Sequence, residues 1–351
     1  MKNSRSTQDD TAAQLWFTAP LQVEVREVVL PPPGPGQLRV RTRLSAVSAG
    51  TEMLVYRGQI PEDMALDASL AVLQGAAAFP LQYGYACVGE VQAVGEGVDA
   101  AWLGRRVFSF APHASQFLAR ASDVIAIPDA VSFDAAVFLA NMETAVNLLQ
   151  DGNPALGERV VVIGQGVVGL LLDSLLARCP LHSLLAVEAL PGRRARALQL
   201  GVHAACDPLD AAAVQSLRAQ LQDGDAVAGA DLIFEVSGAP EALNLALDLS
   251  GYCSRVVIGS WYGSKSASLA LGGAAHRNRL RISTSQVSTL APELSGRWTK
   301  ARRFALCWEM LARTQPESLI THRVPLHDAA ALYQRLHASP ADVLQAVLVH
   351  D

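Results

Sequence analysis

The stretch RVVVIGQGVVG, residues 159–169, decides the fold of this chain. Its first half is a continuous β-branched run, which is typical of a strand buried on both faces of a parallel sheet. The run leads directly into the pattern GxGxxG, and an apolar helical pattern follows over residues 168–177. A strand, a glycine-rich turn and a helix in this order predict the first part of a Rossmann dinucleotide-binding fold.

Each glycine of this pattern has its own task. Gly164 allows the tight turn, Gly166 lets a pyrophosphate approach the backbone, and Gly169 lets the helix pack closely against the strand. The pyrophosphate is expected at the helix N-terminus, where backbone N–H groups and the helix dipole favour negative charge. The predicted cofactor loop consists of Gly164, Gln165, Gly166, Val167, Val168 and Gly169.

The second predicted strand ends at Glu188, nineteen residues after Gly169. A carboxylate there accepts hydrogen bonds from the ribose hydroxyls of adenosine and repels a 2′-phosphate, which favours NAD over NADP. Arg193 and Arg194 follow at once. They keep NADP possible as the cofactor, because an arginine at this place covers the adenine or binds a phosphate.

Strands and helices continue to alternate up to residue 258, which predicts a doubly wound parallel sheet. Strands are expected at 184–188, near 204, at 230–236 and at 255–258, and helices at 193–200, 211–221 and 240–249. The ends of the last two strands are expected to line the cofactor crevice with Ser237, Gly238, Gly259 and Ser260. The last part of the chain adds helices near 302–311 and 329–336 and a closing strand over 343–349.

The chain before this region, residues 14–145, is β-rich. Residues 22–30 and 37–47 alternate between apolar and polar, and the rigid turn PPPGPG lies between them. Turn signals recur through this part, and the one helical pattern is near 133–149. It therefore reads as a separate domain of short strands.

The bulk composition limits the partners of the protein. A net charge of −5 gives no nucleic-acid footprint. The polar first dozen residues lack the apolar core of a signal peptide, and no apolar run reaches the roughly 18 residues of a membrane helix. The five cysteines are too widely spaced for a zinc knuckle and favour reduced thiols. We therefore expect a cytoplasmic protein that binds neither nucleic acid nor membrane.

A β-rich domain, then a dinucleotide domain, then a return to the first domain is an order that resembles the medium-chain dehydrogenases and reductases, which are alcohol dehydrogenase-like. The resemblance implies an α/β fold with a GroES-like β-rich catalytic domain at 13–146 and 287–351. The Rossmann cofactor domain, with its doubly wound parallel sheet, is then expected at 147–286. Residues 1–12 would form a disordered tail.

The positions that carry catalytic zinc ligands in this family hold other residues here. SAGTE, residues 48–52, matches a segment whose cysteine binds zinc, and Ala49 stands in the cysteine position. Tyr85 stands for the histidine of a second segment, and the third ligand would fall near Ala140. With SAGTE, PLQYGY, EVSGAP and ITHR, the chain resembles a zinc-lacking branch marked by SGTE, which includes bacteriochlorophyllide 3-hydroxyethyl dehydrogenase and leaves a sugar or another natural-product intermediate open as the substrate. No metal site is expected, because alanine offers no ligand atom.

The same resemblance suggests which residues carry the chemistry. Without zinc, a hydrogen-bond donor must stabilise the charge on the substrate oxygen, and Tyr85 or Thr51 stands at an inherited position for this task. Glu52 is expected to orient the groups around it. Thr144 and Thr284 fall where the family places residues beside the nicotinamide. Residues 53–80 form a long connection that is predicted to cover the substrate.

These features favour an NAD-dependent interconversion of a secondary alcohol and a ketone. An NADPH-dependent quinone or enoyl reductase and a nucleotide-sensing protein without turnover remain open. A homodimer, paired through the sheet edge near 280–285, is the default of the family. His113 and Glu143 are expected to be a loop histidine and a cap or surface acid. The basic clusters at 276–281 and 297–303 are expected to face solvent or another subunit.

Overall fold

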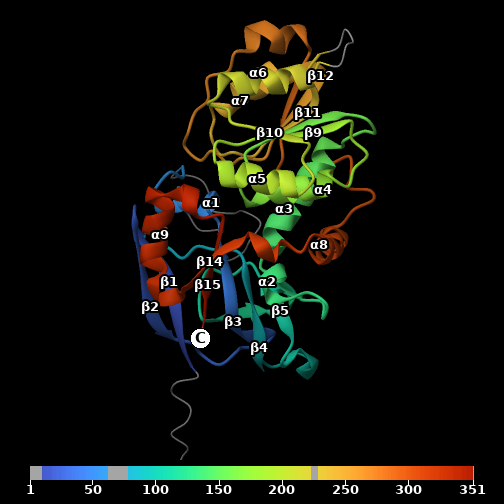
Figure 1. Cartoon of the computed structure of the whole chain (residues 1–351). Coiled ribbons are helices and arrows are strands. Elements are labelled where there is room, and N and C mark those ends of the chain that lie inside the picture. Colours follow the sequence, from blue (N-terminus) through green and yellow to red (C-terminus); the bar gives the residue numbers. More distant parts are fainter. Residues whose placement is uncertain (1–9, 62–77, 223–227, 351) are drawn as a thin grey trace, which may run out of the picture. The chain divides into compact units, whose positions relative to one another are not determined.

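The computed structural model describes residues 10–61, 78–222 and 228–350 (Figure 1). These residues form two compact units. Unit 1 comprises Met1–Ala140 and Leu311–Asp351, and unit 2 comprises Asn141–Met310. Unit 2 is longer at both ends than the cofactor domain expected at 147–286, because both divisions fall inside helices, α3 (Leu139–Gly152) and α8 (Lys300–Thr314).

Unit 1 is built on a seven-stranded sheet with the order β14-β15-β3-β4-β5-β7, and β6 also pairs with β3. All pairs of neighbouring strands in this sheet are antiparallel, except that β14 and β15 are parallel to each other. The strands of the sheet are β3 (Gln37–Val47), β4 (Cys87–Val94), β5 (Arg106–Ser109), β6 (Gln116–Arg120), β7 (Val124–Ala126), β14 (Ile320–Pro325) and β15 (Gln345–Val349). The strand predicted at 37–47 is confirmed as β3, which joins the N-terminal strands to the C-terminal ones.

Among the described residues of unit 1, a hairpin and three α-helices accompany this sheet. The hairpin consists of β1 (Thr11–Ala19) and β2 (Gln22–Val29), and the helices are α1 (Thr51–Tyr56), α2 (Phe133–Ala136) and α9 (Ala329–Ala338). Strand β1 begins two residues before the domain start expected at 13. Residues 1–9 of the expected tail, and 62–77 of the expected substrate loop, lie outside the described residues.

Unit 2 contains the predicted doubly wound sheet. Its six strands have the order β10-β9-β8-β11-β12-β13, and every neighbouring pair is parallel. The strands are β8 (Arg159–Ile163), β9 (Ser183–Val187), β10 (Ala204–Cys206), β11 (Ala230–Glu235), β12 (Ser250–Ile258) and β13 (Arg281–Thr284). Numbered within the unit, the order is 3-2-1-4-5-6, which is the Rossmann arrangement with the crevice beside strand 1.

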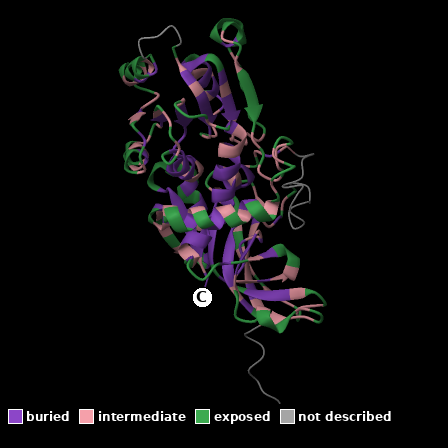
Figure 2. Cartoon of the chain, turned by 90° about the vertical axis from the view of Figure 1, so that its right-hand side faces the viewer, coloured by how far each residue is buried: buried purple, intermediate pink, exposed green. Residues whose placement is uncertain are grey.

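Helices connect these parallel strands, as a crossover connection requires. They are α4 (Val167–Leu176), α5 (Pro191–Gln199), α6 (Ala211–Gln220) and α7 (Ala242–Leu249), with α3 before the sheet and α8 after it. Val161, Leu185, Ile233 and Val256 come from four adjacent strands and pack into one core cluster. Figure 2 shows the buried residues concentrated on the strands of both sheets. The apolar β-branched runs therefore form buried central strands, as predicted.

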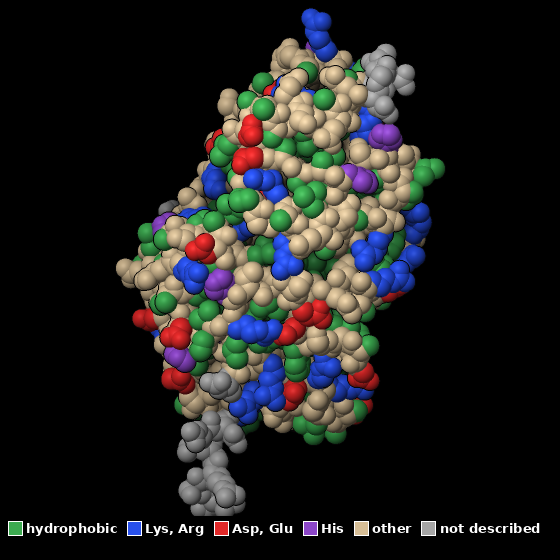
Figure 3. Space-filling view, in the orientation of Figure 1, with side chains coloured by type: hydrophobic (Ala, Val, Ile, Leu, Met, Phe, Trp, Pro, Cys, Tyr) green, Lys and Arg blue, Asp and Glu red, His purple; other side chains and the backbone are tan. Residues whose placement is uncertain are grey.

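The visible surface of unit 1 carries charges of both signs, as the small net charge of the chain suggests. Lys and Arg side chains are intermingled with Asp and Glu side chains over unit 1 in the face shown in Figure 3. No helix within residues 10–61, 78–222 and 228–350 is long and apolar enough to cross a membrane.

Candidate active site

The glycine loop between β8 and α4 has a geometry that only glycine fits at two of its three positions. Gly164 has φ +99°, and a Cβ there would lie 2.5 Å from Ser237 Cα. A Cβ on Gly169 would lie 2.0 Å from Gly164 O, so the helix touches the turn directly. A Cβ on Gly166 would meet no atom within 4 Å. The open side at Gly166 is the space that a pyrophosphate needs.

Helix α4 begins at this open side without a side-chain cap. Gly166 is the N-cap residue, and Val167 and Val168 start the first turn. The first N–H groups of a helix have no partner inside the helix, so an uncapped N-terminus offers them to an anion. The loop therefore fits the diphosphate of a dinucleotide.

Glu188 lies directly after β9 and is bound to the glycine loop. Its Oε2 accepts from Gln165 N at 2.7 Å, and its Oε1 accepts from Leu190 N at 2.9 Å. Burial lowers the pKa of Arg193, and the Glu188 carboxylate works against this shift. Arg194 Nη1 donates to Glu188 O and Asp207 Oδ2. The Glu188 carboxylate is therefore fixed at the glycine loop, and the Arg194 guanidinium is hydrogen-bonded to other groups of the protein.

The side chain of Gln165 turns away from this surface. It is fully buried, and its Nε2 donates to Val162 O at 3.4 Å. Burial raises the pKa of the Asp173 carboxyl well above its usual range, and Gln165 opposes the shift. Only the backbone of Gln165 thus faces the expected cofactor. The GxGxxG pattern does not show whether the side chain or the backbone of its second residue faces the cofactor.

The ends of β11 and β12 are joined by a fully buried carboxylate, Glu235. It accepts from Ser237 N at 2.8 Å, and also from the hydroxyls of Ser237 and Tyr262. Gly238 N donates to Ser260 Oγ at 2.8 Å, and Gly259 N donates to Glu235 O at 2.8 Å. The predicted crevice residues therefore form one hydrogen-bonded group. Tyr262, a part of it, was missed because no motif contains it.

The predicted nicotinamide residues lie near another buried group of unit 2. Thr144 is half-buried on α3, and Thr284 ends β13, where it is exposed. One face of α3 carries Glu143, Asn147 and Asp151. Asn147 Nδ2 donates to Ser285 Oγ at 2.8 Å, and Ser285 Oγ donates to Asp151 Oδ2 at 2.6 Å. This face thus holds the segment that follows β13.

Residues 297–303 were expected to face solvent or another subunit, and Glu143 to be a cap or surface acid. These expectations were wrong for Arg303 and Glu143, which are buried. Arg303 is fully buried and donates to Asn147 Oδ1 and to Thr289 O. Lys300 Nζ donates to the buried Glu143 carboxylate. Burial raises the pKa of Glu143, and Lys300 and Arg303 oppose the shift. These cations hold α8 to α3.

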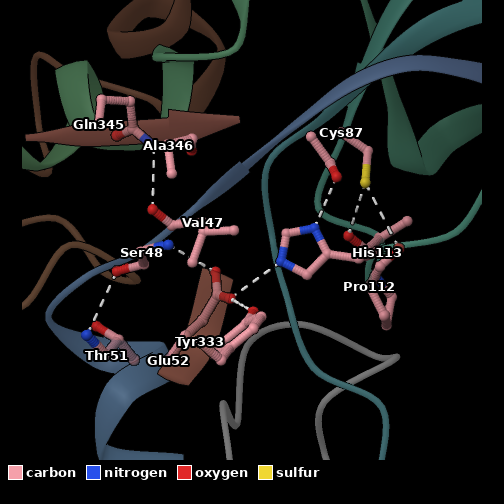
Figure 4. A network of polar contacts seen from close by, with 12 residues as sticks. Val47, Ser48, Thr51, Glu52, Cys87, Pro112, His113, Tyr333, Gln345 and Ala346 are labelled. Carbon is pink, nitrogen blue, oxygen red and sulfur yellow. Dashed lines mark hydrogen bonds and ion pairs between the residues drawn. The ribbon is translucent and has the colours of Figure 1, made fainter. Parts of the chain in front are cut away.

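Unit 1 contains a buried polar network centred on Glu52, which is drawn in Figure 4. Glu52 lies on α1 and is fully buried. Its Oε1 accepts from Ser48 N at 2.8 Å, and its Oε2 lies 3.0 Å from His113 Nε2. The Tyr333 hydroxyl of α9 donates to the same Oε2. The carboxylate is therefore in contact with three groups, whose identities were not predicted.

His113 was expected to be a loop histidine, and it does lie in a loop, but its side chain is not exposed to solvent. It is fully buried in the connection between β5 and β6. Its Nδ1 is hydrogen-bonded to Ser45 Oγ at 2.7 Å. Gly84 has φ +126°, and a Cβ there would lie 2.8 Å from the His113 ring. Gly84 therefore makes room for the imidazole, a purpose that the glycine of the YGY segment did not reveal.

The two predicted donors differ in surroundings. Thr51 is half-buried in the first turn of α1, and its N–H donates to Ser48 Oγ at 3.3 Å. Tyr85 is half-buried beside Tyr83, with ring centroids 6.1 Å apart at an angle of 86°. Tyr85 also lies close enough to Tyr333 to help raise the pKa of that phenol. Both hydroxyls thus belong to residues beside the Glu52 network.

The residues described at the family's three catalytic zinc-ligand positions do not fit a zinc ion. Of the three positions where the resembled family has ligands, Ala49 and Ala140 lack a polar side-chain atom, and Tyr85 has one. Cys87 Sγ donates to Ala111 O at 3.3 Å, and burial with the nearby Glu52 raises its pKa to about 12. A zinc ligand must be a thiolate, imidazole or carboxylate. Within the described ranges, no three His, Cys, Asp or Glu residues are grouped to hold a metal.

Comparisons with known proteins agree with this architecture. No family model matches the chain. D-guloside 3-dehydrogenase of Escherichia coli K12 is 24% identical over 287 residues, which cover 78% of this chain and 81% of that protein. (R,R)-butanediol dehydrogenase of Bacillus subtilis 168 is 25% identical over 263 residues, covering 67% and 73%.

Solved structures are similar over nearly the whole chain. An alcohol dehydrogenase, rspB, from E. coli CFT073 in complex with NADH has a TM-score of 0.77 and 20% identity, covering 97% of this chain and 99% of its own. The zinc-dependent alcohol dehydrogenase 2 from Streptococcus pneumonia has a TM-score of 0.77 and 19% identity, covering 97% and 99%.

The fold is thus that of the alcohol dehydrogenase-like, medium-chain dehydrogenases and reductases, and the predicted fold class is confirmed. The curated relatives are named dehydrogenases, and the chain is accordingly an oxidoreductase.

Proposed function

We propose that this chain is an NAD(H)-dependent oxidoreductase that interconverts a secondary alcohol and a ketone without a catalytic zinc. The observation that carries the proposal is the glycine loop of unit 2, with its open side at Gly166 and the Glu188 carboxylate bound to Gln165 N. The relatives named above act on a guloside and on butanediol by their names. We extend this to a small polar substrate with a secondary hydroxyl.

The preference for NAD rests on the surroundings of Glu188. Its carboxylate is fixed next to the loop by two backbone N–H groups. A 2′-phosphate at this carboxylate would be repelled. Arg194 is bound to backbone carbonyls and Asp207, so its guanidinium is already engaged by the protein. NADP therefore stays the second choice.

In the proposed mechanism, bound NAD supplies the acceptor for a hydride from the substrate carbon. Tyr85 or Thr51 hydrogen-bonds the substrate oxygen and stabilises the charge that develops on it. Glu52 keeps its neighbours in place, since its carboxylate binds Ser48 N, His113 and Tyr333. Thr144 and Thr284 position the nicotinamide, and Ser237, Gly238, Gly259 and Ser260 shape the crevice. The alanines at 49 and 140 support zinc independence and the resemblance to the SGTE branch.

We also propose a cytoplasmic homodimer and keep the domain division at 146 and 287 as a proposal. All five cysteines are free, which suits a reducing compartment. Strand β13 pairs with β12 on one side, and all four of its residues are exposed, including Ile282 at 39%. An exposed sheet edge is a template for pairing with a second copy.

Titration of the metal-stripped protein with NADH and NADPH, followed by substrate assays, tests the function. We expect NADH to bind at least tenfold more tightly, because Glu188 disfavours the 2′-phosphate. A panel of secondary alcohols and polyols with NAD should then give turnover that added zinc does not increase. Tight NADPH binding with reduction of an enone would favour a quinone or enoyl reductase. Binding without any turnover would favour a nucleotide sensor, and binding of neither cofactor would refute the proposal.

Replacing both proposed donors tests the mechanism. Tyr85→Phe and Thr51→Ala each remove one hydroxyl, and the double variant is expected to lose about 10²–10³-fold in kcat, the usual cost of an oxyanion donor. NADH affinity should be unchanged, because the cofactor loop belongs to unit 2. Tyr83→Phe is the matched control for the aromatic pair. Full turnover of the double variant would exclude both hydroxyls as donors.

A further inference from the structure

The segment that follows β13 is held by polar side chains from two helices of unit 2. Asn147 of α3 donates through Nδ2 to Ser285 Oγ at 2.8 Å, and Ser285 Oγ donates to Asp151 Oδ2 at 2.6 Å. Arg303 of α8 donates through Nη2 to Thr289 O at 2.9 Å. The two helices thus hold the same stretch of chain, residues 285–289, at both of its ends.

Arg303 binds the other helix as well as the segment. It is fully buried, and its Nη1 donates to Asn147 Oδ1. The same Nη1 donates to Val287 O at 3.4 Å, so the middle of the segment is attached too. The Glu143 carboxylate lies 3.7 Å from Arg303 Nε and provides the opposite charge. Because a buried guanidinium is costly unless its N–H groups are bonded, the arginine and the segment keep each other in one place.

The backbone provides a further attachment at the start of the segment. Ser285 N donates to Ile258 O at 2.8 Å, which keeps the segment beside the end of β12. Thr284, the last residue of β13, is paired with the same Ile258. Strand β13 is the edge of the described sheet and pairs with β12 alone. The position of its carboxyl end therefore depends on β12 and on the contacts of Ser285.

This carboxyl end belongs to the second half of the Rossmann sheet. Such a sheet consists of two mononucleotide-binding halves, and a dinucleotide lies across the crevice at the carboxyl ends of their strands. The glycine loop and Glu188 follow β8 and β9 of the first half, so the diphosphate and the adenosine are expected there. Strands β11, β12 and β13 form the other half. Their carboxyl ends are therefore the place for the nicotinamide mononucleotide.

We propose that Arg303 and Asn147 are positioning residues for the nicotinamide half of the cofactor. Both side chains are buried, and they act through Ser285 and the segment up to Thr289. They fix the backbone that follows Thr284, and they do so without touching the cofactor themselves. The inference rests on the proposed function, because the dinucleotide and its orientation come from there.

The two halves of the cofactor should depend on these anchors to different degrees. The glycine loop is fixed by its own close contacts, since a Cβ on Gly164 would lie 2.5 Å from Ser237 Cα and one on Gly169 would lie 2.0 Å from Gly164 O. The nicotinamide must instead hold its reacting carbon about 3–3.5 Å from the substrate carbon, and a displacement of about 1 Å costs on the order of 10²-fold in rate. Loss of the anchors should therefore affect the nicotinamide half and spare the adenosine half.

Paired titrations with NADH and ADP-ribose test the inference. ADP-ribose has the adenosine and diphosphate of the cofactor and lacks the nicotinamide. In Ser285→Ala and Arg303→Lys, NADH should bind about tenfold more weakly, the effect of one lost hydrogen bond, while the Kd of ADP-ribose stays within about twofold of wild type. A general loss of structure would weaken both ligands alike. Ser285→Ala keeps the buried charges, so it gives an answer even if Arg303→Lys does not fold.

Two matched variants control this experiment. Ser295→Ala removes a hydroxyl from the same connection between β13 and α8, one whose hydrogen bond, to Pro292 O at 2.8 Å, is local. Arg302→Lys changes the neighbouring arginine of α8, which is exposed and lies 4.2 Å above the ring of Trp298. Both variants should bind NADH and ADP-ribose like wild type.

Turnover provides the second readout, once wild type oxidises a secondary alcohol. At saturating NAD, kcat of Ser285→Ala and Arg303→Lys should fall between about 10-fold and 100-fold, because saturation restores binding and leaves the ring displaced. An unchanged NADH Kd in both variants, or an equal loss of NADH and ADP-ribose affinity, would overturn the inference. Wild type that binds neither ligand would instead count against the proposed function.

Discussion

Valine at Gly166 is expected to remove cofactor binding while the fold remains, whereas valine at Gly169 removes both. A Cβ at Gly166 would meet no atom within 4 Å, so the valine side chain enters the space that the pyrophosphate needs. We expect at least a 100-fold weaker NADH Kd, which corresponds to about 2.7 kcal/mol. At Gly169 the new Cβ would lie 2.0 Å from a backbone oxygen that cannot move away without the turn. The expected cost there is about 3 kcal/mol or more of unfolding free energy.

NADH fluorescence titration and thermal unfolding of the same samples measure both effects. Gly192→Ala is the control, since Gly192 lies in α5, has no close neighbour in its Cβ direction and lacks a positive φ. This substitution should leave binding unchanged and alter stability by less than about 1 kcal/mol. If Gly166→Val bound NADH like wild type, the glycine loop would not be the diphosphate site, and the cofactor assignment would fail with it.

Unit 2 could be predicted from the sequence because its signals are local. The run at 160–163 forms β8, and the helix expected at 168–177 is α4 (Val167–Leu176). Each signal reports which residues a segment buries, and a parallel sheet buries its central strands on both faces. Strand β13 carries no such signal, because as the edge strand it exposes all four residues.

Unit 1 was less predictable for the opposite reason. The partners of Glu52 lie 61 and 281 residues away along the chain, at His113 and Tyr333. The pairing of β3 with β15 brings His350 to Ser45, a separation of 305 residues. A single histidine in a polar loop has the same local sequence whether it is buried or exposed. The chemistry of this network therefore follows from the sheet topology, which one sequence does not reveal.

Removing the Glu52 side chain is expected to destabilise the protein strongly and to stop turnover. Glu52→Ala would leave Ser48 N–H, the Tyr333 hydroxyl and His113 without their buried acceptor. We expect a loss of about 3–5 kcal/mol in the free energy of unfolding, as for other buried ionic groups that lose one partner. Glu52→Gln keeps the shape and should cost less than half as much, but it removes the negative charge next to His113 and Tyr333, so kcat should still fall at least tenfold.

The pH dependence of stability separates this network from a merely well-packed core. The pKa of Tyr333 is raised by its burial first and by Glu52 second. Above about pH 10, the ordinary pKa of tyrosine, the unfolded chain thus binds fewer protons than the folded one at this residue, so unfolding free energy must fall as pH rises. In Tyr333→Phe this fall should be shallower, because the residue that keeps its proton in the folded chain is gone. Denaturant unfolding between pH 8 and 11 measures it, with Glu90→Ala as control, since Glu90 forms a partly exposed pair with Arg43. Equal slopes in wild type and Tyr333→Phe would show that this phenol does not contribute to the pH dependence of stability.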